Sequence, residues 1–147
     1  MNDCHSEIIQ QLLVDLGLGV LRSAHPTSDW PVYATLMADV PDKAICIYDT
    51  EAQLDGRKMV DGENLEHKGF QVMVRAPLHE DGFAKAEAIR IALDQTVYSN
   101  VVTLGSHTYN VHSVTRKGGI LSLGRDVGSS DRQLFTINGI VSVSQLT

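Results

Sequence analysis

The sequence has 147 residues, and its 12 Lys and Arg against 18 Asp and Glu give a formal charge of −6 at pH 7. This length fits one domain, and a hydrophobic content of 43% excludes an intrinsically disordered chain. The acidic balance argues against a protein that binds phosphate groups, which needs clustered lysines and arginines, but not against a protein that DNA slides past.

The two cysteines, Cys4 and Cys46, lie far apart in the chain and favour idle thiols in a reducing compartment over a disulfide. The N-terminal residues have neither a basic flank nor an apolar run of signal-peptide length. No apolar stretch approaches the roughly 20 residues that a membrane-spanning helix needs. We therefore expect a soluble intracellular protein with no membrane partner, or one that assembles inside a cell.

The first predicted element is a helix that begins after an N-cap at Ser6 and ends near Gly17. Its apolar residues recur at helical spacing: Ile8, Ile9, Leu12, Leu13 and Leu16. Residues 22–31 follow as a connector that two prolines interrupt. This connector contains Trp30, which we interpret either as a lid packed on the core or as an anchor at a subunit interface.

Strands are predicted over residues 33–38, 44–48 and 70–76, of which the second is apolar on both faces and the third alternates. Between the last two lies a segment of mixed charge with two Asp-Gly turn signals, residues 51–69. A structureless loop of this length is unusual in a compact domain, so the segment is either a protruding hairpin or a mobile binding loop. It serves either as a solvated, variable loop or as a contact arm for another protein.

A second helix is predicted over residues 81–97. Besides its core-facing arc it carries Ala84, Ala88 and Ile91 on the other side, where a solvated face would be polar. This pattern indicates an outer face that another subunit partly covers, although short helices with two apolar faces also occur in monomers.

The remaining chain predicts strands over residues 109–114 and 135–143, each with alternating apolar residues. The element order is therefore helix, three strands, helix and two strands. This order predicts a single α+β domain over residues 1–147, with two principal helices packed on a mainly antiparallel sheet of four to five strands.

No motif in the sequence indicates catalysis. The six histidines form no HExxH pair and accompany no CxxC motif, and neither a GxSxG elbow nor a GxxxxGK[ST] loop is present. Asp39, Asp42 and Asp49 cluster loosely around a strand, but turn and capping aspartates are commoner than acid–base pairs. We therefore expect no enzyme activity, no cofactor and no bound metal.

Nucleic-acid recognition is also not indicated. The adjacent basic pairs Arg57-Lys58 and Arg116-Lys117 lack the interleaved aromatic residues of a base-stacking platform. Aromatic residues make up 5% of the chain, so such a platform would have few side chains to draw on.

Three segments resemble the tail terminator proteins of long-tailed bacteriophages, also called minor capsid or tail-completion proteins. PDKAICIYDT at residues 41–50 is similar to the family pattern PD-x-x-I-x-I-Y-D-T, and FQVMVRA at 70–76 is similar to the following x-QV-x-VR strand. LGRD at 123–126 with RQLFTIN at 132–138 resembles the C-terminal LG-x-D…R-x-x-F-x-x-N segment. The order and spacing agree over most of the chain, whereas the charged stretch 57–67 has no counterpart.

The resemblance implies a structural virion protein, found at the head-proximal end of the tail and assembled in the host cytoplasm. Such proteins form a hexameric ring on the completed tail tube, stop polymerisation of the tube protein and face the head-side connector or stopper protein. A phage-derived particle such as a gene transfer agent would use a similar part. DNA would pass through the ring without specific binding, because a negative lumen repels its phosphates.

Six residues are predicted at a subunit or tube interface: Trp30, Asp49, Arg75, Ile91, Asp126 and Arg132. The four charged ones lie within the matching segments, where they either pin loops locally or form salt bridges between subunits. Truncating one member of a buried ion pair costs about 3–5 kcal/mol. A ring that dissociates on Arg132→Ala would favour the interface, whereas an unchanged hexamer of unchanged thermal stability would remove both interpretations.

Two alternatives remain at this point. One is another neck component, a head-completion or stopper protein, which would share the size and α+β character but would not bind tail tubes. The other is a small enzyme or ligand-binding domain, which would require a deep pocket with convergent polar groups. Nothing in the sequence predicts such a pocket.

Overall fold

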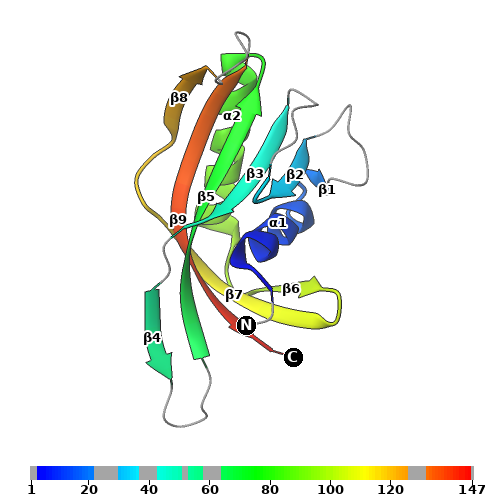
Figure 1. The fold of residues 1–147 in the computed structure, drawn as a ribbon, viewed down its shortest axis with the longest axis vertical. Helices are drawn as coiled ribbons and strands as arrows, with labels where there is room; N and C mark the ends of the chain where they lie inside the picture. The colour runs from blue at the N-terminus through cyan, green and yellow to red at the C-terminus, as the bar shows by residue number, and fades with distance from the viewer. Residues whose placement is uncertain are drawn as a thin grey trace.

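A computed structural model of the chain shows helices packed on a curled sheet (Figure 1). The structure describes residues 3–21, 30–36, 43–50, 53–57, 64–125 and 132–146. The backbone alone is described at residues 53–57, 64–66, 96 and 125. The predicted connector upstream of Trp30 and the first two residues of the PDKAICIYDT segment lie outside these ranges.

Along the described chain, a first helix precedes a first run of strands, and a second helix with a π-helical turn separates it from a second run. In order the elements are α1 (His5–Asp15), β1 (Val20–Leu21), β2 (Pro31–Ala34), β3 (Ala44–Asp49), β4 (Gln53–Arg57), β5 (Asn64–Ala76), α2 (His79–Ile91), the π-helical turn η1 (Ala92–Thr96), β6 (Asn100–Leu104), β7 (His107–Arg116), β8 (Leu121–Arg125) and β9 (Gln133–Gln145).

The described strands form one sheet in the order β1-β2-β3-β5-β9-β7-β6, with β4 added beside β5 and β8 beside β9. Strand β2 runs parallel to both β1 and β3, and the other pairs are antiparallel. The α+β class is confirmed, but the prediction of four to five strands is wrong, because this sheet has nine. The strands that the sequence did not reveal have two to five residues, too few for a clear alternation.

Strand β2 also differs from its predicted extent. It begins at Pro31, since proline is tolerated as the first residue of a strand, where its missing N–H breaks no ladder. It ends at Ala34 because Thr35 adopts a φ of 67°, which is incompatible with an extended backbone.

The long strands β5 and β9 form the centre of the sheet. They pair from Glu66 opposite Val143 to Ala76 opposite Gln133. Gly139 of β9 lies opposite Phe70 of β5, and a Cβ at this glycine would lie 2.9 Å from the Phe70 ring. The glycine therefore makes room for a large buried side chain at the middle of the sheet.

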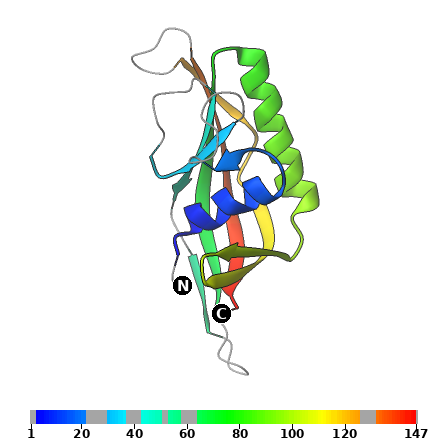
Figure 2. The ribbon, with the colours of Figure 1, turned by 90° about the vertical axis from the view of Figure 1, so that its right-hand side faces the viewer.

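Both helices lie on the same face of the sheet, as the two ribbon views show together (Figures 1 and 2). The core fills the space between them and the sheet. From the helices it takes Ile8, Ile9, Leu12, Leu13, Ala86, Ile89 and Leu93, and from the central strands Phe70, Val72, Val74, Phe135, Ile137, Val141 and Val143. The predicted apolar faces of the strands at 70–76 and 135–143 are the ones that face these helices.

The start of α1 is held by a side chain from the sheet. The helix begins two residues earlier than predicted, with Cys4 in the N-cap position and without a capping side chain of its own. Asp49 of β3 accepts hydrogen bonds from the Ser6 N–H at 2.9 Å and from the Ser6 hydroxyl at 3.2 Å. Ser6 is therefore not the N-cap, and the carboxylate that satisfies the helix start comes from a distant strand.

The opposite face of the sheet is more polar. Two cross-strand hydrogen bonds join β5 to β9 there, Gln71 to Asn138 at 3.1 Å and His67 to Ser142 at 2.8 Å. A smaller buried cluster lies beside them on β2 and β3, formed by Tyr33, Ala44 and Cys46. No described helix packs on this face.

Candidate functional site

Trp30 is held in place by the first strand. The Val20 N–H donates a hydrogen bond to the Trp30 carbonyl oxygen at 2.9 Å. Gly19 passes so close that a Cβ there would lie 2.5 Å from the same oxygen. The indole packs partly against the core. The structure thus shows the contact of Trp30 with the core, and its role at a subunit interface stays a prediction.

The Trp30 notch is an open hollow of about 270 Å³ lined by Trp30, Lys43, Asp81, Ala84, Lys85 and Ala88. The two lysine amines lie 5.6 and 5.5 Å from the centre of the indole ring, within the range of cation–π attraction. The Lys43 amine also lies 3.8 Å from a carboxylate oxygen of Asp81, with both side chains nearly half exposed. Burial lowers the pKa of Lys85, because the charged amine is disfavoured away from water.

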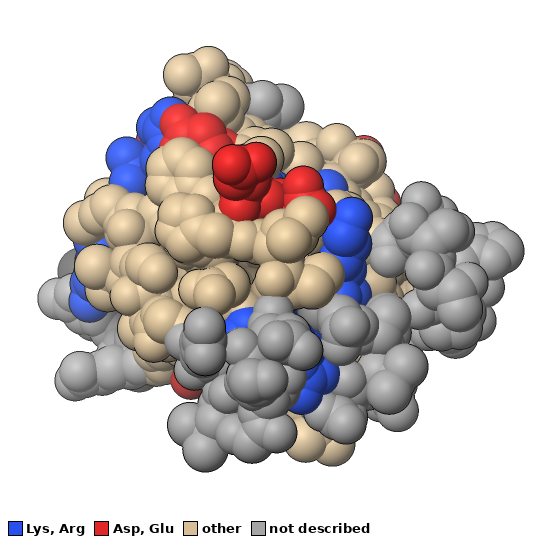
Figure 3. Space-filling view, turned by 90° about the horizontal axis from the view of Figure 1, so that it is seen from above, with Lys and Arg blue, Asp and Glu red and all other residues tan. Residues whose placement is uncertain are grey.

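The outer side of α2 continues this hollow along the helix. Ala84, Ala88 and Ile91 recur at helical spacing, as predicted, and Ile91 is 39% exposed. Figure 3 views the end of the molecule at which α2 begins, where acidic side chains lie between basic ones. The acids at this end of the helix include Glu80 and Asp81 in its first turn, where the helix dipole favours negative charge.

The flank of α2 that faces β7 has a different character. Arg90 donates hydrogen bonds to Glu87 and lies 3.3 Å from Asp94, and Arg116 of β7 bonds Asp94 at 2.8 Å. The hydrogen bond from Arg90 lowers the pKa of Glu87 and in turn raises the pKa of the arginine. Each charge on this flank therefore has an opposite charge within the same chain.

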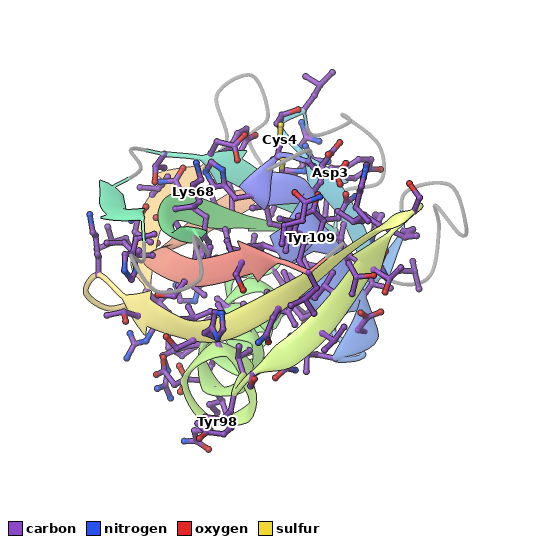
Figure 4. All side chains as sticks on the ribbon, turned by 90° about the horizontal axis from the view of Figure 1, so that it is seen from below. Asp3, Cys4, Lys68, Tyr98 and Tyr109 are labelled. Atoms are coloured by element: carbon purple, nitrogen blue, oxygen red, sulfur yellow. The ribbon has the colours of Figure 1, made fainter. Side chains whose placement is uncertain are left out.

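A second polar cluster holds the N-terminal segment to the β6–β7 turn (Figure 4). Tyr109 donates a hydrogen bond to the Asp3 carboxylate, and its oxygen accepts one from the Asp3 N–H at 3.0 Å. His107 Nδ1 lies 3.1 Å from the same carboxylate. The cluster borders an open hollow of about 380 Å³. These hydrogen bonds anchor the start of the described chain to the start of β7.

The predicted interface residues are not gathered at one place. Trp30 borders the notch and Ile91 lies one helical turn beyond it. Asp49 bonds to the start of α1 and lies 3.0 Å from His5 Nε2. Arg75 and Arg132 are 4% and 9% exposed. Asp126 lies outside the described residues. The interface role of all six stays a prediction.

The structure also brings forward residues that the sequence did not single out. Lys43 and Lys85 converge on Trp30 from segments far apart in the chain, and nothing in the local sequence of either lysine signals the meeting. Burial raises the pKa of Cys46, and a hydrogen bond with Tyr48 and the charge of Arg75 partly offset this effect. Both hollows are open to solvent on the described surface, and neither resembles an enzyme's deep pocket.

Among the described residues, no three His, Cys, Asp or Glu side chains are grouped to hold a metal ion. None of the described helices is long and apolar enough to cross a membrane.

A family model described as bacteriophage tail terminator protein matches residues 12–143. The chain belongs to this family. The resemblance found in the sequence is thereby confirmed: the protein is a structural component of the tail of a phage or phage-derived particle. The matched range spans every described element except the start of α1 and the end of β9.

Two solved structures are similar at low identity. One is a chain from a structure titled virion of native gene transfer agent particle, with 15% identity over 93% of this chain and 91% of that chain and a TM-score of 0.48. The other, whose title states no function, has 20% identity over the same shares and a TM-score of 0.46. These likenesses are too distant to add to the family assignment. No match was found among curated proteins.

Proposed function

We propose that six copies of this chain form a ring on the head-proximal end of the completed tail tube. The ring stops further addition of tube protein and supplies the tail side of the head–tail joint. The observation that carries this proposal is the match to the tail terminator family over residues 12–143. The protein would assemble in the host cytoplasm, with the tube protein on one side and a connector or stopper protein on the other.

The described surface is compatible with a closed ring. A heterologous ring needs two different patches on each subunit, one for each neighbour, and the tube and the connector need further surfaces. Large apolar side chains are exposed at separate places, among them Ile91 on α2, Tyr98 and Val101 near the start of β6, and Leu121 and Leu123 on β8. Tyr98 is 87% exposed and stands away from the body of the fold (Figure 4). Such side chains gain free energy when a partner buries them.

The net charge of −6 supports a passive role towards DNA. A lumen lined by carboxylates repels phosphates, so that DNA passes through the ring without being held. A map of the assembled ring with lysines and arginines lining the lumen would overturn this part of the proposal.

The test of the function is tube capping. Purified tail-tube protein is polymerised with and without the chain, and tube lengths are measured by electron microscopy. We expect a shorter, narrower length distribution with the chain present and density for the chain at one end of each tube. Unchanged elongation together with binding to head connectors alone would favour a stopper protein instead.

The predicted interface residues enter this proposal as contacts to be tested. Arg132→Ala should release subunits from the ring if the arginine bridges two copies. Because Arg132 is 9% exposed in the single chain, thermal unfolding of the variant must be measured alongside ring formation. A stable variant that no longer caps tubes supports the interface role, and a variant that caps normally opposes it.

A further inference from the structure

We propose that the Trp30 notch binds a carboxylate side chain from a neighbouring copy of this chain. This inference rests on the ring of the proposed function, and it names the contact that joins one subunit to the next. In each interface an acidic residue of one subunit would enter between Lys43, Lys85 and the Trp30 ring of the other.

Among the described residues, the positive charge of the notch is only partly neutralised. Lys43 lies 3.8 Å from Asp81, but Lys85 has no carboxylate within ion-pair distance in the described part of the chain. The described lining of the notch therefore holds two ammonium groups against one carboxylate, in a molecule whose net charge is −6. A partly buried cation of this kind favours a second anion from outside.

The shape of the notch suits a single inserted side chain. Ala84 and Ala88 line it from α2, and their methyl groups leave room that longer side chains would fill. Trp30 closes one side with a flat apolar surface, and Ile91 extends the apolar contact by one helical turn. An acidic side chain with an aliphatic stem matches this combination of two amines, an indole face and small apolar residues.

A second copy of the chain is the occupant that the charges favour. The chain has 18 acidic against 12 basic residues. One of the acids outside the notch is Glu7 in the first turn of α1, which borders the second hollow. It is exposed and has no side-chain partner among the described residues. In a heterologous ring a different face of the same chain meets the notch, so that a carboxylate such as that of Glu7 would lie against the two lysines.

Zero-length crosslinking tests the contact directly. A carbodiimide joins an amine to a carboxylate that already touches it, and an equal mixture of ¹⁴N- and ¹⁵N-labelled chains distinguishes links between copies from links within one. The mixture is assembled on tail tubes, treated and analysed by mass spectrometry. We expect mixed-isotope links from Lys85 or Lys43 to an Asp or Glu of this chain.

Variants give the second readout. Lys85→Gln should weaken association between copies by about tenfold, the usual loss when a charged hydrogen bond is removed, whereas Lys85→Arg should preserve it. Lys117→Gln, in the exposed turn after β7, is the matched control and should have no effect. Circular dichroism and thermal unfolding must show that each variant folds.

The outcomes separate this contact from the function itself. Normal tube capping with links from Lys85 to the tube protein overturns the contact between copies but leaves the function standing. If the chain does not cap tubes, the proposed function fails, and the same crosslinking on concentrated free protein decides the contact. Absence of mixed-isotope links in both preparations overturns the inference.

Discussion

Helices α1 and α2 lie on the same face of the sheet but are held in different ways. α1 buries four large aliphatic side chains, and Asp49 of β3 satisfies its first turn. Within α2 proper the buried residues are Gly82, Ala86 and Ile89, and small apolar residues continue onto its outer side. The first turn and the apolar face of α1 are thus satisfied within the chain, whereas α2 exposes apolar side chains that a partner could bury.

The largest expected difference lies in the apolar residues of the two helices. Ile9→Ala on α1 removes a fully buried side chain and should lower the free energy of unfolding by about 2–5 kcal/mol. Ile91→Ala on α2, where the side chain is 39% exposed, should change it by about 0.5 kcal/mol or less. Equilibrium urea unfolding measures both. Equal losses would show that α2 buries its outer side within the chain.

The close approach of α2 to the sheet gives the next effect. A Cβ at Gly82 would lie 2.6 Å from the Phe135 ring, so Gly82→Ala should destabilise the fold by about 1–3 kcal/mol through overpacking. It should do so although alanine favours a helix by about 1 kcal/mol over glycine. Gly119→Ala, which meets no atom within 4 Å, is the control. A higher melting temperature for Gly82→Ala would mean that the Phe135 ring moves aside freely.

The anchoring of α1 predicts a smaller loss. Asp49→Ala removes the acceptor for Ser6 and should cost about 1–2 kcal/mol, as the loss of a helix cap does. Asp15→Asn, at the other end of α1, should cost little, because an acid near a helix C-terminus opposes the dipole. The free energy of unfolding of both variants, measured by chemical denaturation, tests this prediction. If Asp49→Ala leaves the free energy of unfolding unchanged, water or Cys4 is enough to satisfy the N–H groups of the first turn of α1.

The smallest effect concerns pH and Lys85. Because burial lowers the pKa of this amine, the folded protein holds the Lys85 proton less tightly than the unfolded chain does. The cost of burying the charge is present below the lowered pKa and disappears as the pH rises through it towards 10.5. The stability of the wild type relative to Lys85→Met should therefore increase over that window. A difference that is independent of pH, in urea unfolding from pH 7 to 10.5, would contradict the burial.

The predictable part of the fold follows from periodicity. The stripe from Ile8 to Leu13 and the alternation of the strands at 70–76 and 135–143 each identified an element and its core-facing side. Short strands such as β1 and β6 were not predicted, because two to five residues carry little pattern and their pairing depends on distant neighbours. The start of α1 was misplaced for a similar reason, since its acceptor, Asp49, lies 43 residues from Ser6.

For the candidate site, the sequence alone determined three things. These are the order of family segments, the apolar outer side of α2 and the net negative charge, all of which are local or summed properties. Only the tertiary structure decided that Lys43 and Lys85 meet over Trp30 and that Arg75 and Arg132 are buried. The physical reason is that such contacts depend on which distant segments the sheet places side by side. Contacts between residues that are far apart in the chain produce no periodic pattern in the sequence.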